Sequence, residues 1–181
     1  MNKDELWYEY NLSYYDQLLY LKQKYGMPEG NYYLTEECKS TNNKIKRGKE
    51  GLFIHHDYEW NPDDISCHSL SDKELALSHP YEYQTSPHLT YCNLLEHLIL
   101  HIKIYTLRKN ALNGMLFIDG VERFLVPQIN DIYQTKRYKK EWLIATKDCI
   151  QENKDDYLHL LELYSQIASV DISELLELSN R

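Results

Sequence analysis

Three observations predict an α+β protein that is mostly helical. Apolar residues recur at steps of three and four over much of the chain, which is the pattern of amphipathic helices. The run Gly51–Ile54 is short and apolar, and this is typical of one buried strand. A chain of 181 residues, of which 43% are hydrophobic, can bury one good core. We therefore expect residues 1–181 to form a single domain.

The first segment, residues 1–38, is expected to be helical. Apolar and aromatic side chains follow a helical spacing at Leu6, Tyr10, Tyr14, Leu18, Leu21 and Tyr25. This helix should end at Gly26-Met27-Pro28, because glycine and proline both discourage its continuation.

The middle segment, residues 39–110, should contain the strand and a long helix. The strand runs into His55-His56 and is followed by a turn-rich, acidic stretch, in which the capping box Ser71–Glu74 predicts a short helix through Ala76. A stronger helix is expected from about Thr90 to Lys109, where apolar residues cover one face.

The last segment, residues 111–181, is predicted to be helical after an irregular start. Turn signals flank Met115–Ile118, which could pair with Phe124–Val126 as a hairpin or form an irregular link. Helical patterns follow at Val126–Tyr133, Tyr138–Glu152, Tyr157–Ala168 and Ile172–Leu178.

Charge and cysteine content limit the function classes. The formal net charge is −8, which argues against binding nucleic acid over the whole surface, because that affinity comes from Lys and Arg. The acidic excess lies at the two ends of the chain, so a local nucleic-acid site stays open. The four cysteines form no Cys-x-x-Cys pair, and no leader or membrane span is evident. We expect a cytoplasmic protein with reduced thiols and no membrane partner.

Five of the eight histidines form a pattern with chemical meaning. His97 and His101 lie one helical turn apart, a spacing that lets two imidazoles converge on one metal ion. His55 and His56 close the predicted strand, so their side chains should point to opposite faces, one toward a metal and one toward a substrate. His88 precedes the helix and could lie beside the end of that strand.

This arrangement resembles the HNH endonucleases of the ββα-metal fold, including the DNase domains of the colicins. The resemblance rests on His55-His56, His88-Leu89 and His97-x-x-x-His101 and covers about a third of the chain. It implies a ββα-metal core between helical flanks. It also implies that His55, His97 and His101 bind one divalent metal, that His56 is the general base, and that His88 orients this base.

The sequence departs from the family pattern in ways that affect the metal shell. His88 replaces the commoner Asn, and the connection from His56 to His88 is long and acidic. Asp57, Glu59 or Asp63 could therefore join the ligands. The expected ion is Zn, Mn, Ni or Mg, and three imidazoles favour the transition metals over Mg²⁺.

Basic residues bracket the histidines on both sides. The candidates for contact with nucleic acid are Lys46, Arg47, Lys49, Lys103, Arg108 and Lys109. If they lie on one side of the molecule, they would form a groove that follows phosphates around the metal.

The leading hypothesis is therefore a metal-dependent endonuclease that hydrolyses phosphodiester bonds in DNA, in preference to RNA. One alternative is an acidic protein of phage or plasmid type that mimics nucleic acid and inhibits a partner, with a structural or degenerate metal site. Another is hydrolysis of a small phosphoester. The acidic helical flanks could also support a homodimer or contact with a protein partner.

Overall fold

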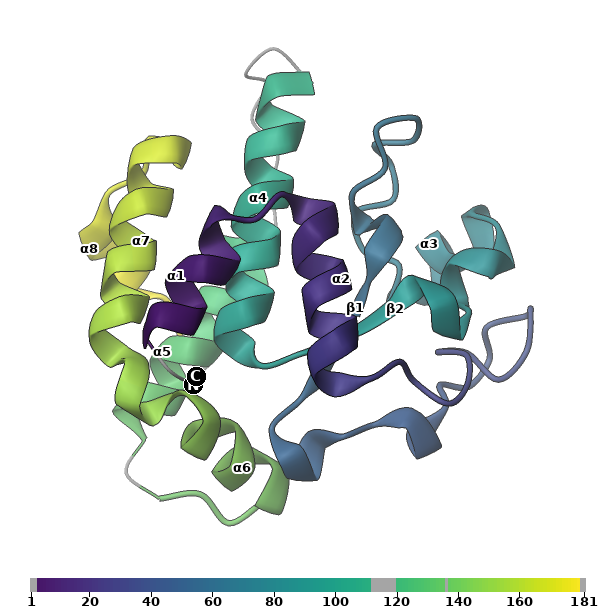
Figure 1. Ribbon diagram of the computed structural model, residues 1–181, viewed down its shortest axis with the longest axis horizontal. Coiled ribbons are helices and arrows are strands. Elements are labelled where there is room, and N and C mark those ends of the chain that lie inside the picture. Colours follow the sequence, from purple (N-terminus) through teal and green to yellow (C-terminus); the bar gives the residue numbers. More distant parts are fainter. Residues whose placement is uncertain (1–2, 112–119, 136, 180–181) are drawn as a thin grey trace.

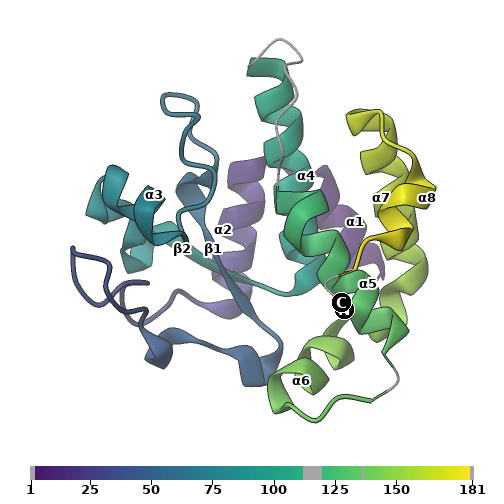
Figure 2. The same ribbon diagram turned by 180° about the vertical axis from the view of Figure 1, so that it is seen from behind.

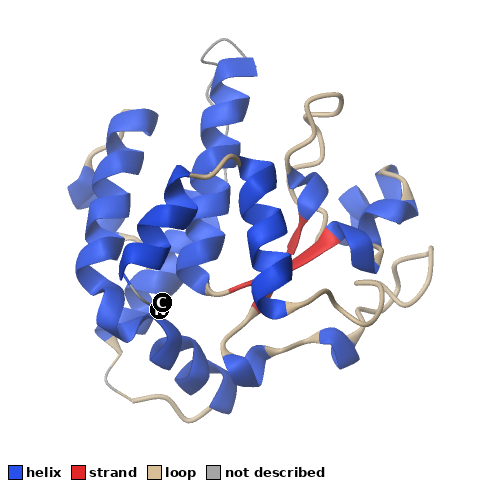
Figure 3. Ribbon diagram, viewed as in Figure 1, coloured by secondary structure: helices blue, strands red, loops and turns tan. Residues whose placement is uncertain are grey.

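The protein is mostly helical and carries a small antiparallel sheet, which confirms the α+β prediction (Figure 3). The computed structural model describes residues 3–111, 120–135 and 137–179. The helices are α1 (Lys3–Asn11), α2 (Tyr14–Tyr25), α3 (Lys73–Ser78), α4 (Leu94–Ala111), α5 (Val126–Gln134), α6 (Glu141–Ile150), α7 (Lys154–Ala168) and α8 (Ile172–Glu177). The strands are β1 (Phe53–His56) and β2 (Leu89–Cys92).

Helix α4 lies at the centre of the molecule, and the other elements pack around it (Figure 1). One apolar cluster joins it to α1, α5 and α7, and its members include Leu98, Ile102 and Leu160. A second cluster joins it to α2, through residues such as Leu18 and Leu100. Because α4 is apolar on two sides, it is buried for most of its length and holds its polar side chains in fixed surroundings.

The two strands place the end of β1 against the start of β2. They pair antiparallel, with His55 opposite Thr90 and His56 opposite Leu89. We predicted that the long helix would begin near Thr90, and this is wrong, because residues 89–92 are the second strand. Helix α4 begins after Asn93, whose side-chain oxygen accepts hydrogen bonds from the backbone N–H groups of Leu95 and Glu96.

The first predicted helix is two helices that meet at Ser13. The Ser13 hydroxyl accepts a hydrogen bond from the backbone N–H of Asp16, and this starts α2 as a separate element. The predicted end is confirmed, since α2 ends at Tyr25 and Gly26 adopts a positive φ of 77°. The short helix of the acidic stretch is also present, but Asp72 caps it instead of Ser71.

The C-terminal helices follow the predicted pattern, and they cover one side of α4 (Figure 2). Phe124–Val126 is helical and continues into α5, while Met115–Ile118 lies outside the described residues. Among the helices that the structure describes, none is long and apolar enough to cross a membrane.

Candidate metal centre

Three imidazoles converge between β1 and α4. His55, His97 and His101 each offer one nitrogen, and the three nitrogens lie within 4.8 Å of one another. The ring of His55 is 5.3 Å from that of His97 and 5.4 Å from that of His101, measured between centroids. The structure thus brings together the three histidines that the sequence singled out as metal ligands. Such a cluster can hold a divalent ion such as zinc.

The protonation of His55 is fixed by Tyr14. The Tyr14 hydroxyl lies 2.8 Å from His55 Nε2 and also 2.8 Å from the carbonyl oxygen of Asp57. A carbonyl only accepts, so the single hydroxyl hydrogen goes to Asp57, and His55 Nε2 must donate to the Tyr14 oxygen. The lone pair of His55 is therefore on Nδ1. This nitrogen is buried and has no hydrogen-bond partner among the described residues.

His97 has the same character. Its Nδ1 is also buried without a hydrogen-bond partner among the described residues. Burial lowers the pKa of His97 well below its ordinary value and lowers the pKa of His55 to about 3. Both rings are thus neutral near pH 7, which is the form that binds metals. Buried nitrogens without partners are costly, and a bound cation would satisfy them.

A carboxylate completes the cluster. Glu59 Oε2 lies 3.3 Å from His101 Nε2 and 3.6 Å from His55 Nδ1. Burial alone would raise the pKa of Glu59, but the hydrogen bond from His101 and the neighbouring imidazoles lower it below its ordinary value. Glu59 is therefore the acid, of the three considered from sequence, that adjoins the histidines. Asp57 instead binds Lys22 and Thr90, and Asp63 is exposed.

His56 points away from the cluster and is held by Gln84. Gln84 Nε2 donates to the carbonyl oxygen of Leu70 at 3.0 Å, so its amide oxygen faces His56 Nε2, also at 3.0 Å. His56 Nε2 therefore carries the hydrogen, and the lone pair is on Nδ1, which lies 3.9 Å from Glu59 Oε1. Burial lowers the pKa of His56, while Glu59 opposes this shift. A neutral, oriented imidazole of this kind can accept a proton.

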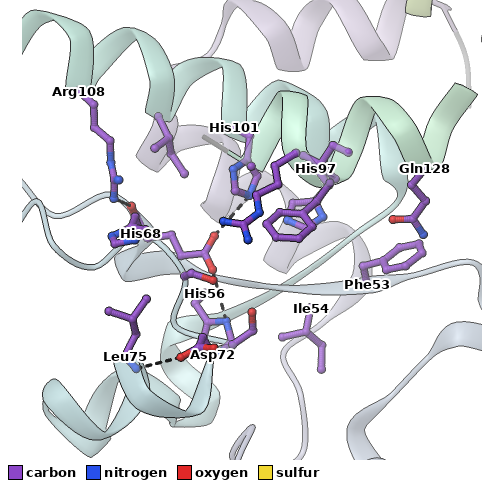
Figure 4. A pocket seen from close by; sticks show the side chains of 18 residues that line it. Phe53, Ile54, His56, His68, Asp72, Leu75, His97, His101, Arg108 and Gln128 are labelled. Atoms are coloured by element: carbon purple, nitrogen blue, oxygen red, sulfur yellow. Dashed lines mark hydrogen bonds and ion pairs between the residues drawn. The ribbon is translucent and has the colours of Figure 1, made fainter. Parts of the chain in front are cut away.

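His56, His97 and His101 line a cavity of about 450 Å³, while His55 lies behind them. In Figure 4, His97, His101 and Arg108 lie on one side of it, and His56 and Asp72 lie on the other. Arg123 and the backbone of Gly120 also line the cavity. Two guanidinium groups beside the histidine cluster suit an anionic ligand such as a phosphate, because Arg binds its oxygens through several donors.

The approach of Gly120 to the cluster is close. A Cβ at this position would lie 2.9 Å from His101 Nδ1 and 3.0 Å from Cε1 of the same ring. Any side chain would therefore displace the imidazole. Glycine is required here by the space that His101 occupies, since the backbone itself is helical.

The structure does not bring His88 to the cluster. Its ring packs on Tyr58, 4.8 Å between centroids, and its Nε2 lies 3.5 Å from Glu82 Oε1. The role of orienting His56, which the resemblance assigns to His88, is occupied by Gln84 instead. The physical reason is the register of the two strands. His56 lies opposite Leu89, and His88 precedes Leu89, so His88 lies beyond the end of the paired residues.

Most of the basic candidates do not form the expected groove. The Lys103 ammonium donates to the Glu9 carbonyl and to Gln17 Oε1, each at 2.7 Å, and Lys109 donates to the carbonyl of Ile167. Both lysines thus bind the last turns of neighbouring helices, α1 and α7, where carbonyls lack partners within the helix.

Of the other basic candidates, three lie away from the cavity and one lines it. Lys46 and Lys49 are exposed, and Lys49 pairs with Glu141 at 2.9 Å, while Arg47 pairs with Glu50. Arg108 alone among the six lines the cavity, and it donates to the Glu59 carbonyl at 2.7 Å. It therefore fixes the backbone of the carboxylate beside the cluster.

Sequence reasoning missed three residues of the site: Tyr14, Gln84 and Arg123. The partners of His55 and His56 come from 41 and 28 residues away along the chain, and no periodic pattern marks them. The sequence placed Tyr14 only on the apolar stripe of the first predicted helix, and in the structure it is buried there.

Comparison of the chain with models of known families, with curated proteins and with solved structures found no match.

Proposed function

We propose that the protein is a metal-dependent phosphodiester hydrolase of HNH type, with the ion at His55, His97 and His101. One observation carries the proposal: the three imidazoles converge, and two of them present buried Nδ1 atoms without hydrogen-bond partners among the described residues. Imidazoles with one adjacent carboxylate favour Zn²⁺, Mn²⁺ or Ni²⁺ over Mg²⁺. A bound ion would supply Lewis-acid stabilisation of the charge that develops on the scissile phosphate and its leaving oxygen.

His56 would be the general base. Its Nε2–H is held by Gln84, so Nδ1 is the atom that takes the proton of the attacking water. Glu59 Oε1, at 3.9 Å from that nitrogen, stabilises the imidazolium that results. The burial of His56 keeps it neutral before the reaction, which a base at pH 7 requires.

Arg108 and Arg123 would hold the substrate phosphate in the cavity. Arg108 is 5% exposed and its guanidinium is anchored to the Glu59 carbonyl, so its position is fixed before substrate arrives. Arg123 is exposed and packs on Phe124, with 5.2 Å between the guanidinium and the ring centre. It can therefore meet an incoming phosphate at the rim.

The proposed substrate is DNA, and a smaller phosphodiester is the second candidate. The cavity of about 450 Å³ favours the second, because pockets for small molecules measure roughly 300–1,000 Å³. His56 is 1% exposed, so a phosphate must enter the cavity to reach it. A nucleic-acid strand would have to present one phosphate there.

The test compares two substrates across metals. The full chain is incubated with supercoiled plasmid and, separately, with bis(p-nitrophenyl) phosphate, in the presence of Mn²⁺, Mg²⁺, Ni²⁺ or Zn²⁺. We expect hydrolysis by the wild type and its loss in His56→Ala, while His159→Ala, which alters a ring packed on Trp7, serves as a matched control.

The outcomes separate the candidates. Nicking of plasmid establishes a nuclease, and turnover of the small diester without nicking establishes the second candidate. Equal activity of wild type and His56→Ala, or none by either with any metal, would overturn the proposal.

A further inference from the structure

We propose that a second metal site lies outside the cavity, formed by Asp64, Cys67 and His79. A carboxylate oxygen, a thiol sulfur and an imidazole nitrogen from these residues lie within 4.8 Å of one another. This spacing suits ligands around one tetrahedral ion, whose bonds to nitrogen and sulfur are roughly 2.0–2.3 Å long. The site does not depend on the proposed function, since it shares no residue with the histidine cluster.

The imidazole is already in the form that a metal requires. His79 Nδ1 lies 2.7 Å from the carbonyl oxygen of Leu75, which only accepts, so Nδ1 carries the hydrogen. The lone pair is therefore on Nε2, which faces Asp64 Oδ2 at 3.4 Å. A histidine that donates its other N–H to a backbone carbonyl is the usual arrangement of a metal ligand.

The carboxylate is held in place by the turn that follows it. Asp64 Oδ1 accepts from the backbone N–H of Ser66 at 3.1 Å and lies 2.5 Å from the Ser66 hydroxyl. That hydroxyl is also 3.0 Å from His79 Nε2, yet it has one hydrogen to give. One hydroxyl hydrogen cannot serve both Asp64 and His79, and the other side-chain donor to Asp64 is the Cys67 thiol, which would lose its proton to a bound cation.

The third ligand explains why the site would select zinc. Cys67 is 0% exposed and contacts the same carboxylate, and its sulfur is the softest donor of the three. Thiolate and imidazole together favour Zn²⁺ over Ca²⁺ or Mg²⁺, which prefer oxygen alone. The three ligands close a loop within the stretch between the strands.

The function of the ion would be to hold the wall of the cavity. The stretch between β1 and β2 contains one α-helix, α3, of six residues and three short 3-10 helices, and few of its apolar residues are buried, among them Leu70 and Ala76. This stretch nevertheless supplies Ser69, Asp72 and Leu75 to the cavity. Where apolar burial is limited, metal binding can supply the free energy that orders a loop.

Cobalt distinguishes this site from the histidine cluster. The reduced full chain is titrated with Co²⁺, because a thiolate ligand gives a charge-transfer band in the near ultraviolet that imidazoles and carboxylates do not. His55, His97 and His101 supply no sulfur, so the band reports on a cysteine ligand and not on the histidine cluster. We expect the band in the wild type and in His97→Ala.

Variants then assign the ligands. Cys67→Ser should abolish the band, while Cys149→Ser, which alters a cysteine outside the site, should keep it. Asp64→Asn retains the turn but removes the charge, and it should weaken cobalt binding roughly 10-fold or more. Because Asp64 is a partly exposed side chain, this variant should fold.

The wild type tests whether the second site exists, and Cys67→Ser tests which residue supplies its sulfur. A wild type that binds cobalt with no charge-transfer band, or that binds none, overturns the second site. A band that survives Cys67→Ser, with native circular dichroism, overturns the assignment of its ligands. If the band is present and phosphodiester hydrolysis is absent, the second site stands and the proposed function fails.

Discussion

Acid should destabilise the fold through its buried histidines. Burial lowers the pKa of His55 to about 3 and also lowers the pKa values of His56 and His97. In the unfolded chain each should titrate near its ordinary value of about 6.5. The unfolded chain therefore binds more protons below that value. The stability that depends on these neutral rings is complete above about pH 6.5 and is lost as the pH falls toward the folded pKa.

The size of the effect follows from proton linkage. Between about pH 7 and about pH 5, His55 should reduce the free energy of unfolding by about 2 kcal/mol, and His56 and His97 act in the same direction. Glu9 acts in the opposite direction, because burial and the nearby Glu96 raise its pKa to about 7. Protonation of Glu9 should return about 2 kcal/mol over the same range. The contributions of His55 and Glu9 therefore nearly cancel, and the net loss of stability in acid comes from His56 and His97, whose pKa values burial also lowers.

Urea unfolding followed by tryptophan fluorescence at a series of pH values measures this loss. Zn²⁺ added at neutral pH should raise the unfolding midpoint, and the gain should disappear in acid, because protons compete for the same nitrogens. His97→Ala should flatten the pH dependence. A stability that is constant or higher at about pH 5 would refute the view that these rings are held neutral.

Three substitutions test other contacts of the site. Gly120→Ala should displace the His101 ring and weaken metal binding roughly 10- to 100-fold in a competition with a chelating dye, and unchanged affinity would contradict the close approach. Tyr14→Phe removes the acceptor of His55 Nε2 and should cost about 1–3 kcal/mol of stability by calorimetry, so a neutral result would reject this tautomer. Lys103→Met should lower stability by about 1–3 kcal/mol and leave DNA affinity unchanged, whereas the reverse result would restore Lys103 as a phosphate contact.

The sequence could predict the histidine pair of α4 because its geometry is local. His97 and His101 share a face of one helix, and a helix fixes that relation whatever surrounds it. Alternation along a strand separates His55 from His56, but only the resemblance to the HNH endonucleases assigned His55 to the metal and His56 to the substrate. The same reasoning could not find where α4 begins. The apolar pattern of residues 89–92 fits strand and helix alike, and only pairing with β1 decides between them.

The partners of these histidines were beyond sequence reasoning for a related reason. Gln84 reaches His56 from the stretch between the strands, and Tyr14 reaches His55 from α2. Each contact depends on how separate elements pack, and neither residue type is unusual at its position. His88, by contrast, stood out in the sequence because histidine is scarce, yet its side chain packs on Tyr58.

The basic residues show why charge counts alone do not predict a nucleic-acid groove. Lys103 and Lys109 project from α4, the most buried helix, so their ammonium groups must find acceptors within the protein. They find them at the C-terminal turns of α1 and α7, where negative partial charge collects. Of the described side chains that line the cavity, Arg108 and Arg123 carry the permanent positive charge. This positive charge is confined to the cavity, where one phosphodiester group would bind, so the site should gain little affinity from the neighbouring phosphates of a longer strand.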